Sequence, residues 1–397
     1  MPVNIKREEA LVKYWVRCKA NPSNPTNNSY PDAITDIDNE YIDRLKNKNF
    51  GAANKGKMLE HELGINLKAT NPSSVNIAPW DLPEVTTDLE LARVISKKED
   101  NPKVSKAKTL EHIDNKYRDH IKIYTDGSKK DEKVGLGIFA DSPHTFSKVK
   151  TNVTDNASIL TAELTAIKIA TIMVHSEQLT NQRVVILTDS LSAVKAIRTP
   201  NIKHSRPDIS FNILKVCGII KENLNTTIEL CWIPAHCDIK GNEEADHLAK
   251  EGLECQNVST VGLGKTEMYS LVRKAFKAKW QASWDEYSKG KLVNTILPNV
   301  GKIKLEFNRT NRKINNLRMG GAQLKIFKTP CSYCKEEVTI EHIFKGCLAY
   351  APIRESIRRK CEVLGYPDTN AALLSLEAPK DIQTLVRKLL RAVKELF

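Results

Sequence analysis

Residues 232–246, WIPAHCDIKGNEEAD, carry the most distinctive pattern in this chain of 397 residues. The apolar run over residues 228–233 that leads into them predicts a β-strand. Gly241 opens a helix predicted over residues 241–253, with Asp246 in its first turns. His236 lies between the two, on a predicted loop. The stretch therefore predicts a strand, a loop and a helix that together present a histidine and an acid.

The residues upstream extend this pattern into a larger α/β domain. The predicted strands are residues 121–125, 134–140, 146–150 and 184–187, and the predicted helices are residues 158–175, 191–198 and 207–223. Three strands, a helix, a strand, two helices, a strand and a final helix is an order typical of a mixed sheet. We therefore expect an α/β fold with a five-stranded mixed sheet flanked by helices.

Four acids stand where a carboxylate is costly unless it is solvated, paired or bound to a metal: Asp126, Glu163, Asp189 and Asp246. Asp126 and Asp189 each follow an apolar strand, and the ends of neighbouring parallel strands meet at one edge of a sheet. Glu163 lies in an apolar helix, on or beside the face expected to pack on that sheet. Converging acids repel one another without a cation, and oxygen ligands select Mg²⁺ or Mn²⁺ over zinc.

Each acid also has an ordinary explanation. Asp-Gly and Asp-Ser are common turn and helix-cap pairs, and Glu163 fits the rim of a packed helix. Two divalent ions about 4 Å apart activate a water and stabilise the leaving oxygen in phosphodiester cleavage, which is the chemistry that four converging acids favour. Taken singly, none of the four decides between these explanations.

Five motifs, taken in order, resemble the type 1 ribonuclease H domain. They are YTDGS at 124–128, TAEL at 161–164, LTDS at 187–190, WIPAH at 232–236 and GNEEAD at 241–246. The resemblance covers residues 118–254. It implies a ribonuclease H-like fold and an endonuclease that cuts the RNA strand of RNA–DNA hybrids and leaves 5′-phosphate ends.

The resemblance also implies roles for particular residues. Four acids are implied as ligands of two Mg²⁺ or Mn²⁺ ions: Asp126, Glu163, Asp189 and Asp246. His236 is implied as an auxiliary group in proton transfer or product release. Ser128, Asn156 and Ser158 occupy positions where the family contacts the hybrid backbone. Selectivity for the hybrid is then expected from 2′-hydroxyl contacts and groove shape rather than from base identity.

A second group of metal-ligand residue types lies in residues 331–347: Cys331, Cys334, His342 and Cys347. The paired cysteines and the spacing C-x2-C-x7-H-x4-C are typical of zinc ligands. The alternative is a set of unmetallated thiols beside a surface histidine. We expect a zinc site here, followed by C-terminal helices within residues 348–397.

The net charge of +13 favours a polyanionic partner, and nucleic acid suits it. Residues 265–328 contain fifteen lysines and arginines against four acids, so the basic helical region expected over residues 265–330 is a candidate grip on nucleic acid. A solvated basic surface is the alternative. Residues 1–115 are expected to be a linker-like region, which a polar segment at 96–108 joins to the next unit.

The sequence shows no feature of a secreted or membrane protein. No apolar run approaches the roughly 18 residues that span a bilayer, and the opening MPVNIKREEALVKYW lacks the apolar stretch of a signal peptide. The nine cysteines are mostly scattered and are typical of reduced thiols. We expect an intracellular protein, nuclear or cytoplasmic, with no membrane partner.

The whole arrangement resembles the C-terminal portion of non-LTR retrotransposon polyproteins. There, a ribonuclease H domain follows the reverse transcriptase, and a tryptophan-bearing helical region and a Cys/His cluster come after it. Residues 1–115 then correspond to the linker after the polymerase. Two alternatives remain: a non-catalytic nucleic-acid-binding remnant, which the retained acids argue against, and a transposase or integrase of the same fold, which residues 232–246 argue against.

Overall fold

The protein forms two compact units. A computed structural model describes residues 1–21, 24, 52–64, 81–95, 101–141, 148–201, 205–256, 258–259, 261–288, 292–301, 314–315, 317–318, 330–375 and 378–393. The first unit spans Ala10–Arg273, and the second combines Met1–Glu9 with Lys274–Phe397. The sheet and the four acids belong to the first unit, and the Cys/His cluster belongs to the second.

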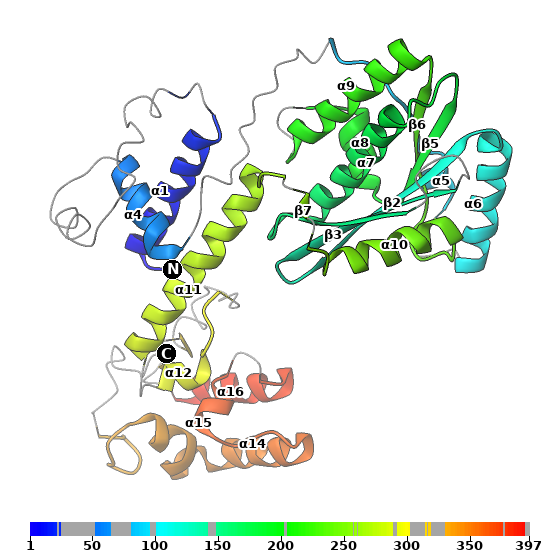
Figure 1. Cartoon of the computed structure of the whole chain (residues 1–397). Helices are drawn as coiled ribbons and strands as arrows, with labels where there is room; N and C mark the ends of the chain where they lie inside the picture. Colours follow the sequence, from blue (N-terminus) through cyan, green and yellow to red (C-terminus); the bar gives the residue numbers. More distant parts are fainter. Residues whose placement is uncertain are drawn as a thin grey trace. The chain divides into compact units, whose positions relative to one another are not determined.

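A mixed sheet forms the centre of the first unit (Figure 1). Its five long strands are β2 (Ile121–Lys130), β3 (Lys133–Asp141), β4 (Lys148–Val153), β5 (Arg183–Thr188) and β6 (Thr227–Trp232). β3 pairs antiparallel with β2 and β4, whereas β5 pairs parallel with β2 and β6. The predicted α/β fold, with five mixed strands and flanking helices, is confirmed.

Two short strands extend this sheet at its edges. β1 (Thr86–Asp88) pairs parallel with β6, and β7 (Val258–Ser259) pairs parallel with β4. The order among the described residues is therefore β1-β6-β5-β2-β3-β4-β7. Both added strands come from outside the five-stranded domain expected over residues 118–254.

A helix replaces part of the polar linker that the sequence predicts over residues 96–108. α6 (Pro102–Tyr117) begins where the Asn101 side chain accepts a hydrogen bond from Lys103 N at 3.0 Å, with proline in its first turn. Four of its residues are buried along one side: Ser105, Thr109, Ile113 and Tyr117. The linker prediction is wrong here. The buried side chains are spaced about one helical turn apart, which gives the helix one packed face, and the lysines between them face solvent.

Asp88 ties β1 to α6. It is 4% exposed, and its Oδ2 accepts hydrogen bonds from Tyr117 Oη at 2.8 Å and Lys116 Nζ at 2.9 Å, with His112 Nε2 at 2.7 Å. Burial acts to raise the pKa of Asp88, but these bonds and one from Glu90 N lower it to about 2. Residues 86–95 and 101–117 are thus folded onto the sheet, and the linker prediction for residues 1–115 does not hold for them.

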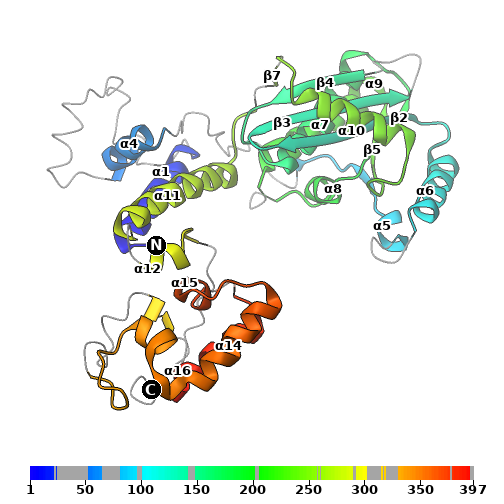
Figure 2. The same ribbon diagram turned by 90° about the horizontal axis from the view of Figure 1, so that it is seen from below.

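Helices cover both faces of the sheet. α7 (Ile159–Ser176) and α9 (Pro207–Leu224) pack together on one face, with α8 (Leu191–Arg198) beside them, and α10 (Lys240–Gly252) crosses β2, β3 and β4 on the other (Figures 1 and 2). By length and hydropathy alone α7 matches a membrane span, which the sequence analysis did not anticipate. However, 56% of that helix is buried inside the protein. It is the core helix of this unit.

Two further helices of the chain pack through a tryptophan. Trp15 of α1 (Val3–Lys19) is 1% exposed, and its Nε1 donates to Glu60 Oε2 of α4 (Ala52–Leu63) at 3.1 Å. The short helix α5 (Leu91–Val94) follows β1. These elements account for the described residues that precede α6.

The second unit is helical, as expected for residues 348–397. α11 (Lys265–Ser288) contributes residues to both units. Further helical elements of the second unit are α12 (Leu292–Ile296), a π-helix (His342–Gly346), a 3₁₀ turn (Leu348–Tyr350), α14 (Ala351–Leu364), α15 (Asn370–Leu373) and α16 (Lys380–Ala392). Buried apolar side chains of the elements from α12 to α16 form a core that includes Cys331 and Cys347. Part of the basic segment expected over residues 265–330 lies outside the described residues, mainly at 302–313 and 319–329.

Candidate active site

Parallel pairing of β2 and β5 places Asp126 beside Asp189. Thr125 pairs with Thr188, so the residues that follow them lie next to each other where β5 ends. Asp189 comes directly after its strand, as the sequence predicts. Asp126 instead lies inside β2, which continues to Lys130 because it remains paired with β3. The two acids therefore meet at the point where one strand ends and its neighbour continues.

Helix α7 brings Glu163 to the same point. The helix approaches β2 so closely that a Cβ at Gly127 would lie 2.9 Å from Ala162 Cβ and 3.0 Å from Glu163 N. Only glycine fits there without moving the helix. Carboxylate oxygens of Asp126, Glu163 and Asp189 lie within 4.8 Å of one another as a result.

This cluster of three acids is crowded, with two of its members buried and Asp189 half-buried. Asp126 is 7% and Glu163 is 5% exposed, and Glu163 Oε2 is a buried oxygen for which the described residues offer no hydrogen-bond donor. Burial and the charges of Asp189 and Asp246 raise the pKa of Asp126 to about 7. Burial, Asp126 and Asp189 raise the pKa of Glu163 well above its usual value. A divalent cation fits this group, because it would satisfy the buried oxygen and neutralise the repulsion.

Asp246 faces the cluster from α10. The backbone of α10 passes over Gly137, where a Cβ would lie 2.1 Å from Ala245 O, and Gly137 is the cross-strand partner of Asp126. Cross-strand partners point to the same face of a sheet, so Asp126 and α10 share a face. Asp246 Oδ2 accepts a hydrogen bond from Lys250 Nζ at 2.5 Å. Asp246 thus acts on Asp126 through its charge but is not among the three acids whose oxygens meet.

The motif at residues 232–246 supports the site through its tryptophan. Trp232 Nε1 donates to Asp189 O at 3.0 Å, and Ile233 N donates to Thr188 O at 3.0 Å, so the end of β6 fixes the backbone that carries Asp189. His236 is exposed on the loop between β6 and α10, with a φ of 54°. It is accessible to solvent and does not belong to the acid cluster.

The three residues expected to contact a hybrid lie on two elements. Ser128 is half-buried in β2, and Asn156 occupies a turn before α7 with a φ of 65°. Ser158 is the N-cap of α7, and its Oγ accepts a hydrogen bond from Thr161 N at 3.2 Å. Ser158 therefore has a structural role in the helix, and contact of these three residues with a hybrid stays a prediction.

Comparison with known proteins finds one family model that matches part of this chain and solved structures that are similar to part of it. Residues 118–254 match the family model of RNase H. This segment is an RNase H domain. Solved structures with similarity include LC11-RNase H1, isolated from compost by a metagenomic approach, at 21% identity over 34% of this chain and 96% of that one, with a TM-score of 0.28. RNase H1 from the halophilic archaeon Halobacterium salinarum shares 17% identity over 34% and 97%, with a TM-score of 0.28. LC11-RNase H1 in complex with an RNA/DNA hybrid shares 19% over 34% and 99%, with a TM-score of 0.27.

Two charged residues beside the RNase H domain's core helix were missed by the sequence analysis. Arg206 is 1% exposed and Glu267 is 5% exposed, and they form an ion pair close to the first turn of α7. No motif or periodicity marks them. A charged side chain is expected at the surface unless a partner is known, so the sequence gives no reason to place either residue in the interior. Only the three-dimensional arrangement identifies them.

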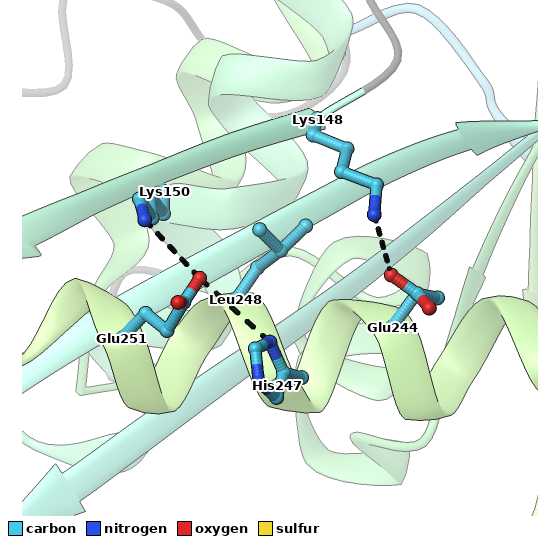
Figure 3. Close-up of a pocket in the computed structure, with 6 residues that line it drawn as sticks. All are labelled: Lys148, Lys150, Glu244, His247, Leu248 and Glu251. Carbon is cyan, nitrogen blue, oxygen red and sulfur yellow. Dashed lines mark hydrogen bonds and ion pairs between the residues drawn. The ribbon is translucent and has the colours of Figure 1, made fainter.

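A pocket of about 530 Å³ beside α10 is separate from the acid cluster (Figure 3). Its charged residues are already paired: Lys148 Nζ lies 2.8 Å from Glu244 Oε2, and Lys150 Nζ lies 3.2 Å from Glu251 Oε2. Exposed ion pairs of this kind contribute little energy, and they leave no unmatched charge for a ligand. They join β4 to α10 and offer no catalytic group.

The second unit brings together the four residues of the Cys/His cluster. The ligand atoms of Cys331, Cys334, His342 and Cys347 lie within 4.8 Å of one another. Cys331 Sγ and Cys347 Sγ are 3.8 Å apart, which is too far for a disulfide, and Cys334 Sγ is 3.4 Å from His342 Nε2. Glu336 Oε2 lies 3.2 Å from His342 Nδ1, so a carboxylate orients the imidazole with Nε2 toward the thiols.

The thiols of this cluster differ in acidity. Burial acts to raise the pKa of Cys331, but hydrogen bonds from the N–H groups of Cys334 and Tyr333, with the His342 side chain, lower it to about 6. Burial and the nearby Cys331 raise the pKa of Cys347 to about 11. A thiolate at Cys331 thus disfavours a second one unless a cation is present, and the sulfur and nitrogen donors suit zinc.

Proposed function

We propose that the RNase H domain hydrolyses the RNA strand of RNA–DNA hybrids with two divalent cations, Mg²⁺ or Mn²⁺. The observation that carries this proposal is the convergence of Asp126, Glu163 and Asp189 within 4.8 Å, around a buried Glu163 oxygen without a donor. A protein that only binds nucleic acid has no use for such a cluster, because buried acids repel phosphate.

The acids have distinct parts in this mechanism. Asp126, Glu163 and Asp189 hold the cations, and Asp246 completes the site from α10. Bound there, the ions would activate a water for attack on the phosphorus and stabilise the leaving 3′-oxygen, so that the P–O3′ bond breaks and the products carry a 3′-hydroxyl and a 5′-phosphate. The chain itself contributes rigid placement, since paired strands fix Asp126 and the Trp232 indole fixes the backbone of Asp189.

His236 and the turn before α7 act on the substrate. His236, exposed on its loop, moves a proton through its imidazole nitrogens between the reacting phosphate and solvent, and so assists the chemistry without binding the metal. Ser128, Asn156 and Ser158 contact the hybrid backbone beside the acids. The proposed preference for a hybrid follows from 2′-hydroxyl groups and groove shape.

Substrate discrimination tests the proposal against its alternatives. The purified full chain is incubated with Mg²⁺ and a hybrid labelled on its RNA strand, a hybrid labelled on its DNA strand, and duplex DNA. Cleavage of the labelled RNA alone is expected. Binding without cleavage would support the non-catalytic remnant, and cleavage of duplex DNA would support a transposase or integrase.

We also propose that the Cys/His cluster binds one zinc ion through Cys331, Cys334, His342 and Cys347. The approach of all four ligand atoms within 4.8 Å supports this, as does the Glu336 carboxylate behind His342. The ion is structural, because four protein ligands leave no open position for a substrate.

The chain's origin is a further part of the proposal. The order of an RNase H domain, a tryptophan-bearing helix and a Cys/His cluster supports derivation from a non-LTR retrotransposon, and with it an intracellular location, nuclear or cytoplasmic. The genomic sequence upstream of the coding region tests this origin. A reverse transcriptase reading frame is expected there, and its absence from every copy in the genome would contradict the proposal.

A further inference from the structure

A buried polar network joins the first turn of α7 to the first turn of α11. Glu267 Oε1 accepts hydrogen bonds from Ser158 N and Thr161 Oγ1, each at 2.5 Å. Glu267 Oε2 accepts one from Gly264 N at 2.6 Å and lies 3.4 Å from Arg206 Nη1. A single carboxylate from beyond the RNase H domain therefore holds the start of its core helix.

Arg206 closes this network from the start of α9. Its Nη1 donates to Thr161 Oγ1 at 3.1 Å, and its Nε and Nη2 donate to Asp208 at 3.0 and 2.7 Å. The guanidinium is 1% exposed, so its charge depends on the two carboxylates of Asp208 and Glu267. Charged hydrogen bonds in a buried site are strong and directional, and removing one partner leaves an uncompensated charge.

The network fixes the turn that carries Glu163. The first N–H groups of a helix have no partner within the helix, and a negative charge is favourable at that end. Glu267 supplies both an acceptor and the charge at the N-terminus of α7. Thr161 Oγ1 donates to Glu267 Oε1 and accepts from Arg206 Nη1, and Thr161 is two residues before Glu163. A change in the position of this turn therefore moves Glu163 relative to Asp126 and Asp189.

We propose that Glu267 is a positioning residue of the cation site, although it lies outside residues 118–254. Together with Arg206 and Thr161 it holds α7 so that the Glu163 carboxylate meets those of Asp126 and Asp189. This inference rests on the proposed function. Under this inference, the first turn of α11 helps to position the cation ligands of the nuclease.

Mg²⁺ binding by the hybrid-free full chain tests this role. In Glu267→Ala, the Mg²⁺ concentration needed to raise the melting temperature by a given amount above its value in EDTA should increase about tenfold or more, as is typical when support for a metal ligand is lost. Glu286→Ala, which removes an exposed acid from the same helix, should match the wild type.

A second pair of variants keeps the test decisive if Glu267→Ala does not fold. Thr161→Ser retains the hydroxyl that Glu267 and Arg206 bind. Thr161→Val retains the shape of the side chain but loses that hydroxyl. Thr161→Val alone should raise the Mg²⁺ requirement.

Unchanged Mg²⁺ affinity in folded Glu267→Ala, or equal affinities in the two Thr161 variants, would overturn the inference and leave Glu267 as a purely structural residue. A wild-type protein that shows neither Mg²⁺-dependent stabilisation nor cleavage would instead overturn the proposed function, and this inference with it. The two failures are distinguishable because only the second affects the wild type.

Discussion

Asp126→Asn should stabilise the metal-free protein above neutral pH, although it removes a group that the proposed chemistry requires. Burial and the charges of Asp189 and Asp246 raise the pKa of Asp126 from 3.8 to about 7. Between these values the folded state holds a proton that the unfolded state has released, so the free energy of unfolding falls as the pH rises from about 4 to about 7. Asparagine has a similar shape and no charge, and it avoids this loss.

The size of the effect follows from the interval between the ordinary pKa of Asp126 and its raised value in the folded protein. Each pH unit within it is worth about 1.4 kcal/mol, so the variant should gain up to about 4 kcal/mol at pH 8 and less than about 2 kcal/mol at pH 5. The first figure is an upper bound, because Glu163 shares the same crowding and also has a raised pKa. For a unit of this size, the gain corresponds to a rise in melting temperature of roughly 10 °C at pH 8 in EDTA.

Scanning calorimetry at pH 5 and pH 8, in EDTA and then with Mg²⁺, measures this gain. Mg²⁺ that binds the folded state should stabilise the wild type, and that response should be largely lost in Asp126→Asn. Asp119→Asn is the matched control, because Asp119 is an exposed carboxylate 3.5 Å from Arg183, and it should change little at either pH. An Asp126→Asn protein that melts at or below the wild-type temperature at pH 8 in EDTA would refute the reasoning.

Three further outcomes are expected. The Mg²⁺ concentration for half-maximal cleavage should fall as the pH rises through about 7, because protons compete with the cation for Asp126; an identical requirement at pH 6 and pH 8 would contradict this. His236→Ala should slow single-turnover cleavage by about 10²–10⁴-fold and leave measurable activity, so that complete inactivity of the folded variant would place His236 at the metal. Metal analysis should find about one zinc per chain, lost in Cys334→Ser and retained in Cys255→Ser; a zinc-free wild type would exclude the site.

The parts of the fold that local patterns predict are those built from consecutive, strongly apolar elements. β5 and α7 have near-continuous apolar runs, and the structure places them within one or two residues of the predicted bounds. Asp189 at the end of β5 and Glu163 within α7 follow from those elements. The approach of Asp126 to Asp189 follows from the parallel pairing of their strands.

The extension of β2 beyond Asp126 was not predictable in this way. Gly127, Ser128, Lys129 and Lys130 show no apolar alternation, yet they remain paired with β3 through backbone hydrogen bonds. Such pairing depends on the partner strand and not on the side chains of the strand itself. The sequence therefore predicts a strand that ends before Asp126. In the structure it is the neighbouring strand β5 that ends at this level, whereas β2 continues to Lys130.

Several features beyond residues 118–254 were missed because long-range contacts define them. β1 has three residues and exists only through its pairing with β6 and the hydrogen bonds of Asp88. Glu267 stands in a lysine-rich segment, where an acid is expected to face solvent, and its partners lie 61 and 109 residues away in the chain. One local signal was present. Asn101 followed by proline is typical of a helix start, and it predicts α6.

Cleavage of a hybrid by the wild type and by Asp189→Asn is the most direct test of the central claim. The full chain is mixed with a hybrid labelled on its RNA strand, with Mg²⁺ and then with excess EDTA, and the ends of the products are identified. RNA fragments with 5′-phosphates are expected from the wild type with Mg²⁺, and none from the wild type in EDTA or from folded Asp189→Asn. Cleavage that continues in EDTA, or that survives the loss of Asp189, would contradict a cation site built from these acids.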